Sequence, residues 1–166
     1  NPYTGCAHGC TYCYASFMRR FSGHQEPWGE FVDVKVGAPQ ILRRQLRRAK
    51  PGRVWVSSVT DAYQPLEKEY RLTRACLEAL LEVQFPVDVL TRSPLCLRDM
   101  DLFERFEDFS IGFSVGTEND SMRALFEAHA PPVQSRINAL RTLHEAGLRT
   151  YAFLGPLLPL DAASLV

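Results

Sequence analysis

The chain has 166 residues, 46% of them hydrophobic and 23% charged, and its 19 Lys and Arg balance its 19 Asp and Glu. This length and composition predict one globular domain over residues 1–166 with a sizeable core. The balanced charge gives no electrostatic indication of a nucleic-acid partner. No apolar run approaches the ~18 residues of a membrane-spanning helix, and no signal-peptide pattern opens the chain. Five cysteines without a secretory pattern predict a cytoplasmic protein with no membrane partner.

The first fifteen residues read NPYTGCAHGCTYCYA and hold three cysteines in a C-x3-C-x2-C array: Cys6, Cys10 and Cys13. Thiolates are soft ligands that suit iron–sulfur clusters or zinc, and crowding three of them is costly unless a cation shares their charge. The spacing would also fit one face of a helix. However, Pro2, Gly5 and Gly9 favour an irregular loop. We therefore expect a loop that lets the three sulfurs converge on a metal centre.

The number of cysteines limits which kinds of metal centre the loop can hold. A closed structural site needs four ligands, so three leave one metal position open for a substrate or cofactor. Two alternatives stay open: a disulfide-bonded knot, and a zinc site completed by His8 or His24. The odd number of clustered thiols argues against the knot. Zinc would favour a second cysteine pair, but Cys76 and Cys96 stand alone.

The segment after the cysteine array, Ser16–Glu30, is rich in aromatic and basic residues and has no clean period. It predicts an irregular cover packed over the metal centre. Phe31–Val36 alternates like a short strand. Ala38–Ala49 predicts a helix with Pro39 in its first turn, and its four arginines form a basic face that we expect to be solvated.

From residue 53 onward, strand and helix patterns alternate. Strands are expected at Arg53–Val59, Val87–Thr91, Phe109–Val115 and Arg149–Leu154. Helices are expected at Arg71–Gln84, Leu97–Phe106, Ser121–Ala128 and Gln134–Ala146. This α/β alternation requires a parallel sheet, and parallel barrels carry their active sites at the carboxyl ends of the strands. The segments expected around one mouth are Ser57–Asp61, Thr91–Ser93, Ser114–Thr117 and Gly155–Pro156.

The cysteine array resembles the signature of the radical S-adenosylmethionine (radical SAM) superfamily, C-x3-C-x-aromatic-C, with Tyr12 as the aromatic residue. The ordered blocks SSVTDAYQPLE, LTRACLEALLE, VLTRSPLCLRDMDL, SVGT and HEAGL resemble the DNA repair photolyase-like branch, which is related to spore photoproduct lyase. The resemblance covers almost the whole chain. It implies a partial (β/α)6 TIM-like barrel, here truncated at both ends. The residues at the end of the chain separately lead us to expect a further helix beginning near Leu165 and Val166.

The resemblance also implies cofactors and roles. The three cysteines would ligate a [4Fe-4S] cluster whose open iron binds S-adenosylmethionine (AdoMet), and a flavodoxin- or ferredoxin-type protein would supply the electron. AdoMet would be cleaved reductively to a 5′-deoxyadenosyl radical that abstracts a hydrogen atom from an unknown substrate. The residues implied to line the AdoMet site are Tyr12, Tyr14, Ser57, Ser58, Thr60, Asp61, Arg92, Ser114, Leu154 and Gly155.

Individual roles follow from the same resemblance. The hydroxyl and carboxylate groups between Ser57 and Asp61 would bind the AdoMet amine, because an ammonium needs oxygen acceptors. Arg92 would bind the carboxylate through a charge-assisted bond. Ser114 would reach the ribose or the carboxylate, and Leu154–Pro156 would pack on the adenine.

One feature departs from spore photoproduct lyase. Ser57 and Ser58 stand where the lyase carries a cysteine that donates hydrogen to a product radical, and a serine O–H bond is too strong for that role. Cys96 is expected to pack rather than to replace it. Two other functions stay open: a DNA photoproduct lyase-type repair enzyme, with nucleic acid as substrate, and a non-catalytic metal-binding module. Substrate contacts are expected at Tyr63, Gln64, Glu118 and Arg123.

Overall fold

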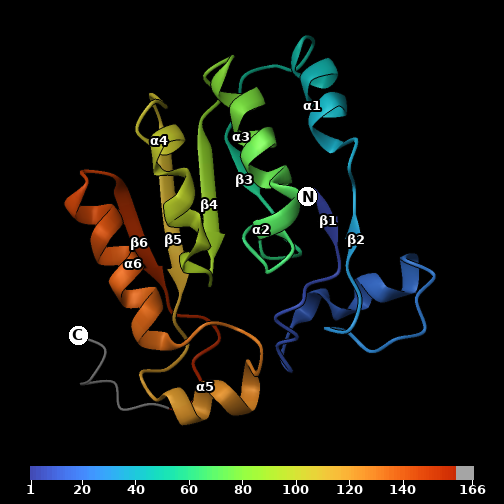
Figure 1. The fold of residues 1–166 in the computed structure, drawn as a ribbon, viewed down its shortest axis with the longest axis vertical. Helices are drawn as coiled ribbons and strands as arrows, with labels where there is room; N and C mark the ends of the chain where they lie inside the picture. The colour runs from blue at the N-terminus through green and yellow to red at the C-terminus, as the bar shows by residue number, and fades with distance from the viewer. Residues whose placement is uncertain (160–166) are drawn as a thin grey trace.

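The computed structural model describes residues 1–159, so the helix expected near Leu165 and Val166 lies outside the described residues. A four-stranded parallel sheet with the strand order β3-β4-β5-β6 forms its centre (Figure 1). The strands are β3 (Val54–Val56), β4 (Val87–Thr91), β5 (Phe109–Ser114) and β6 (Arg149–Phe153). Spatial order follows chain order, which confirms the predicted α/β class with a parallel sheet.

Helices connect the strands and cover one face of the sheet (Figure 1). The α-helices of the described residues are α1 (Ala38–Leu46), α2 (Glu67–Tyr70), α3 (Leu72–Leu81), α4 (Met100–Phe103), α5 (Asp120–Phe126) and α6 (Val133–Glu145). Figure 1 places α5 beyond the carboxyl ends of the strands, on the same side of the molecule as the cysteine loop. None of the helices between residues 1 and 159 has the length and apolar character that crossing a bilayer would require.

The two faces of the sheet differ because side chains alternate along each strand. Val87 and Val89 of β4 are fully buried and belong to the same hydrophobic cluster as Leu77 and Leu80 of α3. On the opposite face, Trp55 stays 56% exposed. The core therefore lies between the sheet and its helices, and the other face contributes Trp55, Leu90, Ser114 and Phe153 to the lining of a cavity.

Several predicted segments differ from the structure. Phe31–Val36 contains only a two-residue strand, β2 (Asp33–Val34), which pairs antiparallel with β1 (Tyr3–Thr4) in the cysteine loop. The helix expected at Leu97–Phe106 is a 3-10 helix, Pro94–Asp99, followed by α4. It begins earlier because Ser93 Oγ accepts a hydrogen bond from the N–H of Leu95 (3.3 Å) and Pro94 suits the first turn. Part of the expected irregular cover is a 3-10 helix, Tyr14–Phe21.

Backbone conformation explains where other elements end. The strand expected over Arg53–Val59 stops at Val56 because Ser57 has a φ of 64°, which an extended strand cannot contain. Likewise, α3 begins at Leu72 after Arg71, whose φ is 50°. Both deviations lie in connections, where local hydrogen bonds compete with regular structure.

Gly112 on β5 permits a close approach that no other residue allows. A Cβ there would lie 2.3 Å from Cε2 of Tyr151 on β6, and the Tyr151 ring is held by its hydroxyl, which donates to Asp88 Oδ1 (2.5 Å). We expect Gly112→Ala to lower the free energy of unfolding by ~1–3 kcal/mol through overpacking, measured by urea denaturation. Gly52→Ala is the matched control because its Cβ would meet nothing within 4 Å. Equal stability of the two variants would contradict this account.

Candidate active site

A cavity of about 460 Å³ lies at the carboxyl ends of the parallel strands. Its walls come from the cysteine loop, from the cover and from residues that end or follow each strand. The predicted site residues that line it are Cys6, Cys10, Cys13, Tyr12, Tyr14, Ser57, Ser58, Thr60, Asp61, Arg92, Ser114 and Gly155. Leu154 is the exception, while Phe153 and Pro156 line the cavity instead. Successive side chains at a strand end lie on opposite faces, which separates Leu154 from Phe153.

The cysteines present their sulfurs to this cavity from an irregular loop, as expected. Cys6 and Cys10 are buried, and burial raises the pKa of the Cys6 thiol to about 12 and that of Cys10 to about 11. Thiolates would therefore form here only when a metal shares their charge. Within residues 1–159, no three His, Cys, Asp or Glu side chains are arranged to bind one metal ion. The expected convergence on one point is not observed; separate sulfurs suit separate irons of a cluster.

The zinc alternative finds little support among the described residues. His24 does not line the cavity; its ring stacks on Phe31 with centroids 4.2 Å apart, and its Nε2 lies 2.8 Å from Asp33 Oδ1. His8 does line the cavity, but it faces Asp61 rather than completing a ligand set with the thiols. The donor set that remains at this wall is three thiols.

The cysteine loop is held from two sides. On one side, Gln64 is fully buried; its Oε1 accepts from the N–H of Ala7 (3.0 Å) and its Nε2 donates to the carbonyl of Gly5 (3.4 Å). On the other side, the N–H of Thr11 donates to the carbonyl of Phe126 at the end of α5 (2.9 Å). Backbone groups of an irregular loop need such partners when they are buried. The loop is therefore fixed by the protein around it.

The predicted cover packs directly on the cysteine loop. Gly9, with a φ of 58°, meets Gly29, where a Cβ would lie 2.7 Å from the Gly9 Cα. Next to this contact, Trp28 contributes to the cavity wall. Tyr14 reaches across the cavity, and its hydroxyl donates to the carbonyl of Ser58. This close backbone contact holds the cover against the cysteine loop.

Several buried polar atoms on the cavity wall have no hydrogen-bond partner among the described residues. They are both ring nitrogens of His8, Oγ of Ser57 and Nε1 of Trp28. The Nε2 of His8 lies 3.4 Å from Asp61 Oδ2, an ion-pair distance without hydrogen-bond geometry. Buried polar groups are nearly always paired, so unpaired groups in residues that line a cavity favour a polar ligand there. The residues present therefore fit a cluster together with a polar cofactor.

Asp61 joins the ends of two strands. Its carboxylate accepts from Thr91 Oγ1 (2.6 Å) and from the N–H groups of Arg92 (2.7 Å) and Tyr63 (2.8 Å). Burial alone would raise the pKa of Asp61, but the charge of His8 and these donors hold it below its usual value. Protein donors occupy this carboxylate, and Thr60 Oγ1 donates to the carbonyl of Asp61 (3.1 Å) and accepts from Gln64 Nε2 (3.2 Å). The hydroxyl of Ser57 has no such partner among the described residues and is the freer group to bind a ligand.

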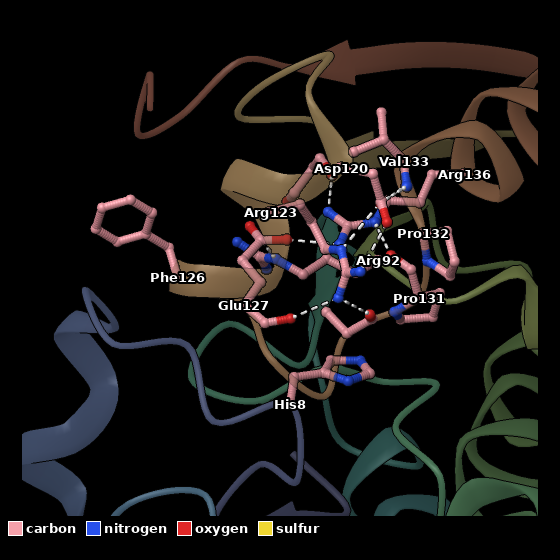
Figure 2. A network of polar contacts seen from close by, with 12 residues as sticks. His8, Arg92, Asp120, Arg123, Phe126, Glu127, Pro131, Pro132, Val133 and Arg136 are labelled. Carbon is pink, nitrogen blue, oxygen red and sulfur yellow. Dashed lines mark hydrogen bonds and ion pairs between the residues drawn. The ribbon is translucent and has the colours of Figure 1, made fainter. Parts of the chain in front are cut away.

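Arg92 follows β4 and lies within a network of polar contacts (Figure 2). Its Nε donates to Glu127 Oε1 (3.2 Å) and its Nη2 to the Tyr12 hydroxyl (3.1 Å), with the guanidinium 6.0 Å from the centre of the Tyr12 ring. Glu127 also accepts from Tyr12 and from Arg136 Nη2 (2.5 Å). Although burial alone would raise it, Arg92 and Arg136 lower the pKa of Glu127. A carboxylate thus lies behind the cavity wall.

The expected substrate contacts are placed elsewhere. None of Tyr63, Gln64, Glu118 and Arg123 lines the cavity, and Tyr63 and Gln64 are fully buried. Arg123 instead donates to the carbonyls that end α5, including that of Ala130 (3.1 Å). Cys96 is fully buried within the hydrophobic cluster, as its expected packing role requires.

Sequence patterns missed three residues of the site: Trp28, Glu127 and Arg136. All three lie inside segments whose sequence predicts only a helix or the irregular cover. The partners of Glu127 are Tyr12 and Arg92, 115 and 35 positions away in the chain. No local pattern contains such contacts. His8 was considered only as a zinc ligand, and its position beside Asp61 became apparent only in the structure.

The architecture is shared with a solved enzyme structure. A doubly substituted variant of spore photoproduct lyase, solved with bound AdoMet and dinucleoside spore photoproduct, matches with a TM-score of 0.67 and 19% identity. The match covers 93% of this chain and 44% of the lyase chain. At this identity the likeness is one of fold, and it confirms the expected partial TIM-like barrel.

Relatives by sequence include an uncharacterized protein of Methanocaldococcus jannaschii, 37% identical over 159 residues. Another is the radical SAM Nα-GlyT isomerase of Pseudomonas phage M6, 27% identical over 160 residues. The matches cover 96% and 95% of this chain but only 60% and 32% of the two relatives. The chain therefore spans about three fifths of the length of the first relative and about one third of the length of the second.

The comparison with models of protein families matches nearly the whole chain. Residues 1–161 match the sequence model of the radical SAM superfamily. Members of this superfamily are enzymes that use a [4Fe-4S] cluster and AdoMet, and the cysteine loop, the cavity and the partial barrel described above agree with that chemistry. The chain belongs to the radical SAM superfamily.

Proposed function

We propose that this protein is a radical SAM enzyme that binds a [4Fe-4S] cluster through Cys6, Cys10 and Cys13 and cleaves AdoMet reductively. When bound, such a cluster supplies the electron that converts AdoMet to methionine and a 5′-deoxyadenosyl radical, which abstracts a hydrogen atom from the substrate. A flavodoxin- or ferredoxin-type protein is the proposed electron donor.

One observation carries the proposal. The three thiols share a cavity wall with orphaned buried polar atoms of His8 and Ser57. Three thiols leave one iron of a cluster without a protein ligand, and the orphaned atoms call for a polar molecule beside it. An amino acid moiety, with an amine and a carboxylate, meets both requirements.

The chain's own residues would bind and orient AdoMet. Ser57, Ser58 and Thr60 offer hydroxyl and carbonyl oxygens to the amine. Arg92 offers its guanidinium to the carboxylate as a charge-assisted bond. Tyr12 and Tyr14, together with Gly155 and Pro156, supply flat or apolar surface for the adenine and ribose. The cover around Trp28 would exclude water, which protects a reactive radical from side reactions.

A nucleic-acid lesion is a second candidate substrate. Besides the fold shared with spore photoproduct lyase, the 3-10 helix Tyr14–Phe21 exposes Phe17 and Phe21 next to Arg19 and Arg20. Exposed aromatic rings and basic groups together suit stacking on bases and contact with phosphates. Ser57 and Ser58 in place of a hydrogen-donating cysteine argue against the lyase reaction itself. Salt-sensitive binding of a single-stranded oligonucleotide would favour this substrate class.

The proposal is tested anaerobically on the full chain, reconstituted with iron and sulfide. Dithionite and AdoMet are added, and 5′-deoxyadenosine is measured by mass spectrometry. We expect 5′-deoxyadenosine to form only when dithionite, AdoMet and the loaded protein are all present. If protein with full iron and sulfide content forms none, the enzymatic proposal fails and the non-catalytic metal-binding module becomes the better description. A colourless protein that retains zinc would also contradict it.

A further inference from the structure

Glu127 is a buried carboxylate that no sequence pattern pointed to. It follows α5, is 1% exposed, and does not line the cavity. A buried carboxylate is costly unless charged partners and hydrogen bonds compensate for its lost hydration. Three side chains do so here: Tyr12, Arg92 and Arg136. The compensation links the cysteine loop, the end of β4 and helix α6 at a single group.

The two arginines of this network are used differently. Arg136 is fully buried and its donors are taken up by protein: Nε by the carbonyl of Pro131 (2.9 Å), Nη1 by that of Ser114 (3.0 Å) and Nη2 by Glu127. Arg92 lines the cavity, and among residues 1–159 no hydrogen bond involves its Nη1. Glu127 pairs with Arg92 through Oε1 and with Arg136 through Oε2, within the network drawn in Figure 2. Protein groups therefore hold Nε and Nη2 of Arg92, and Nη1 remains available to bind a ligand.

The charges of the network do not cancel. Two buried or half-buried guanidinium groups share one carboxylate, which leaves an excess of one positive charge. Because Arg136 is enclosed, the excess is presented at Arg92, on the cavity wall. A desolvated cation with free donors is a binding site for an anion. Beside the thiols, the carboxylate of AdoMet meets that description.

We propose that Glu127 is a positioning residue for AdoMet: by holding Nε of Arg92 and the hydroxyl of Tyr12, it aims the free edge of Arg92 at the AdoMet carboxylate. This inference rests on the proposed function. Glu127 touches neither cofactor nor cavity and acts only through Arg92 and Tyr12. Without Glu127, the Arg92 side chain would lose its fixed orientation. AdoMet binding would then have to order that side chain, and the entropy cost would weaken the affinity.

The test compares the variant Glu127→Gln with the wild-type chain, both reconstituted to the same iron and sulfide content. AdoMet binding is measured by equilibrium dialysis, and the EPR spectrum of the reduced protein is recorded during AdoMet titration. We expect the dissociation constant and KM for AdoMet to rise roughly 10–100-fold, the usual range for residues that orient a ligating group. At saturating AdoMet, kcat should change far less. A merely structural role would lower iron content or stability without this split between KM and kcat.

Two further variants make the outcome decisive. Glu145→Gln alters an exposed carboxylate on α6 and should bind AdoMet like the wild type. Glu127→Asp keeps the countercharge for Arg136 but shortens the side chain, so it carries the test if Glu127→Gln does not fold; it should weaken AdoMet binding in the same direction. Wild-type affinity in both Glu127 variants would overturn the inference alone. A loaded wild-type protein that neither binds nor cleaves AdoMet would instead overturn the proposed function.

Discussion

Replacing Cys10 by alanine is expected to abolish cluster loading and to lower 5′-deoxyadenosine formation by at least ~100-fold, more than the loss of an orienting residue costs. Cys10 is 8% exposed and lines the cavity. Two thiols cannot hold the three irons that need protein ligands. Iron and sulfide content after anaerobic reconstitution, and mass spectrometry of the products, measure both effects.

The matched control for this prediction is Cys76→Ala. Cys76 is also a buried thiol, but it lies on the inner stripe of α3, far from the cavity lining. Its loss should cost ~1 kcal/mol of stability through a small packing defect and leave the iron content unchanged. Should Cys10→Ala retain the iron and sulfide of the wild type, Cys10 is not a ligand and the assignment of the cysteine array fails.

Arg136→Met is expected to lower the free energy of unfolding by ~3–5 kcal/mol, because it leaves a buried carboxylate short of one charged partner. Arg136 is fully buried, and methionine fills similar volume without replacing the bonds to Glu127, Ser114 and Pro131. The loss therefore reflects unpaired polar groups more than a cavity. Urea denaturation of both chains measures the difference.

Arg141→Met on the same helix tests whether this effect depends on burial. Arg141 is exposed, and its replacement should change stability by no more than ~0.5 kcal/mol. In a double-mutant cycle, Glu127→Gln should cost less in the Arg136→Met background than alone, since the two residues share one interaction. Additive effects of the two changes, or a small effect of Arg136→Met, would mean that the buried pair contributes little.

Agreement between sequence and structure is closest where local pattern and burial point the same way. Val87–Thr91 was predicted residue for residue because it lies between the turn at Pro86 and the polar residues after it. β5 and β6 differ from their predicted ranges by one residue each. In these strands the apolar content that forms the core also encodes the strand. Helix ends were less certain, since caps and 3-10 turns depend on single hydrogen bonds.

The contents of the candidate site were also largely predictable. Parallel strands bring their carboxyl ends to one edge, so the residues after each strand had to meet near the cysteine loop. Chain order alone therefore brought Ser57, Arg92 and Ser114 to the same cavity. What the pattern could not tell is which of these groups would be free. Asp61 is taken up by Thr91, Arg92 and Tyr63, and that depends on the packing of two strand ends.

By itself, the sequence determined the class of chemistry and the fold class: a three-cysteine loop at the carboxyl edge of a parallel sheet. It could do so because thiol spacing and strand periodicity are local properties of the chain. Only the tertiary structure decided how the loop is held and how Arg92 is oriented. The carboxylate of Glu127 and the guanidinium of Arg136 come from segments whose local pattern encodes no more than a helix. Their pairing is a matter of burial and charge compensation between distant residues, and such terms exist only once the chain has folded.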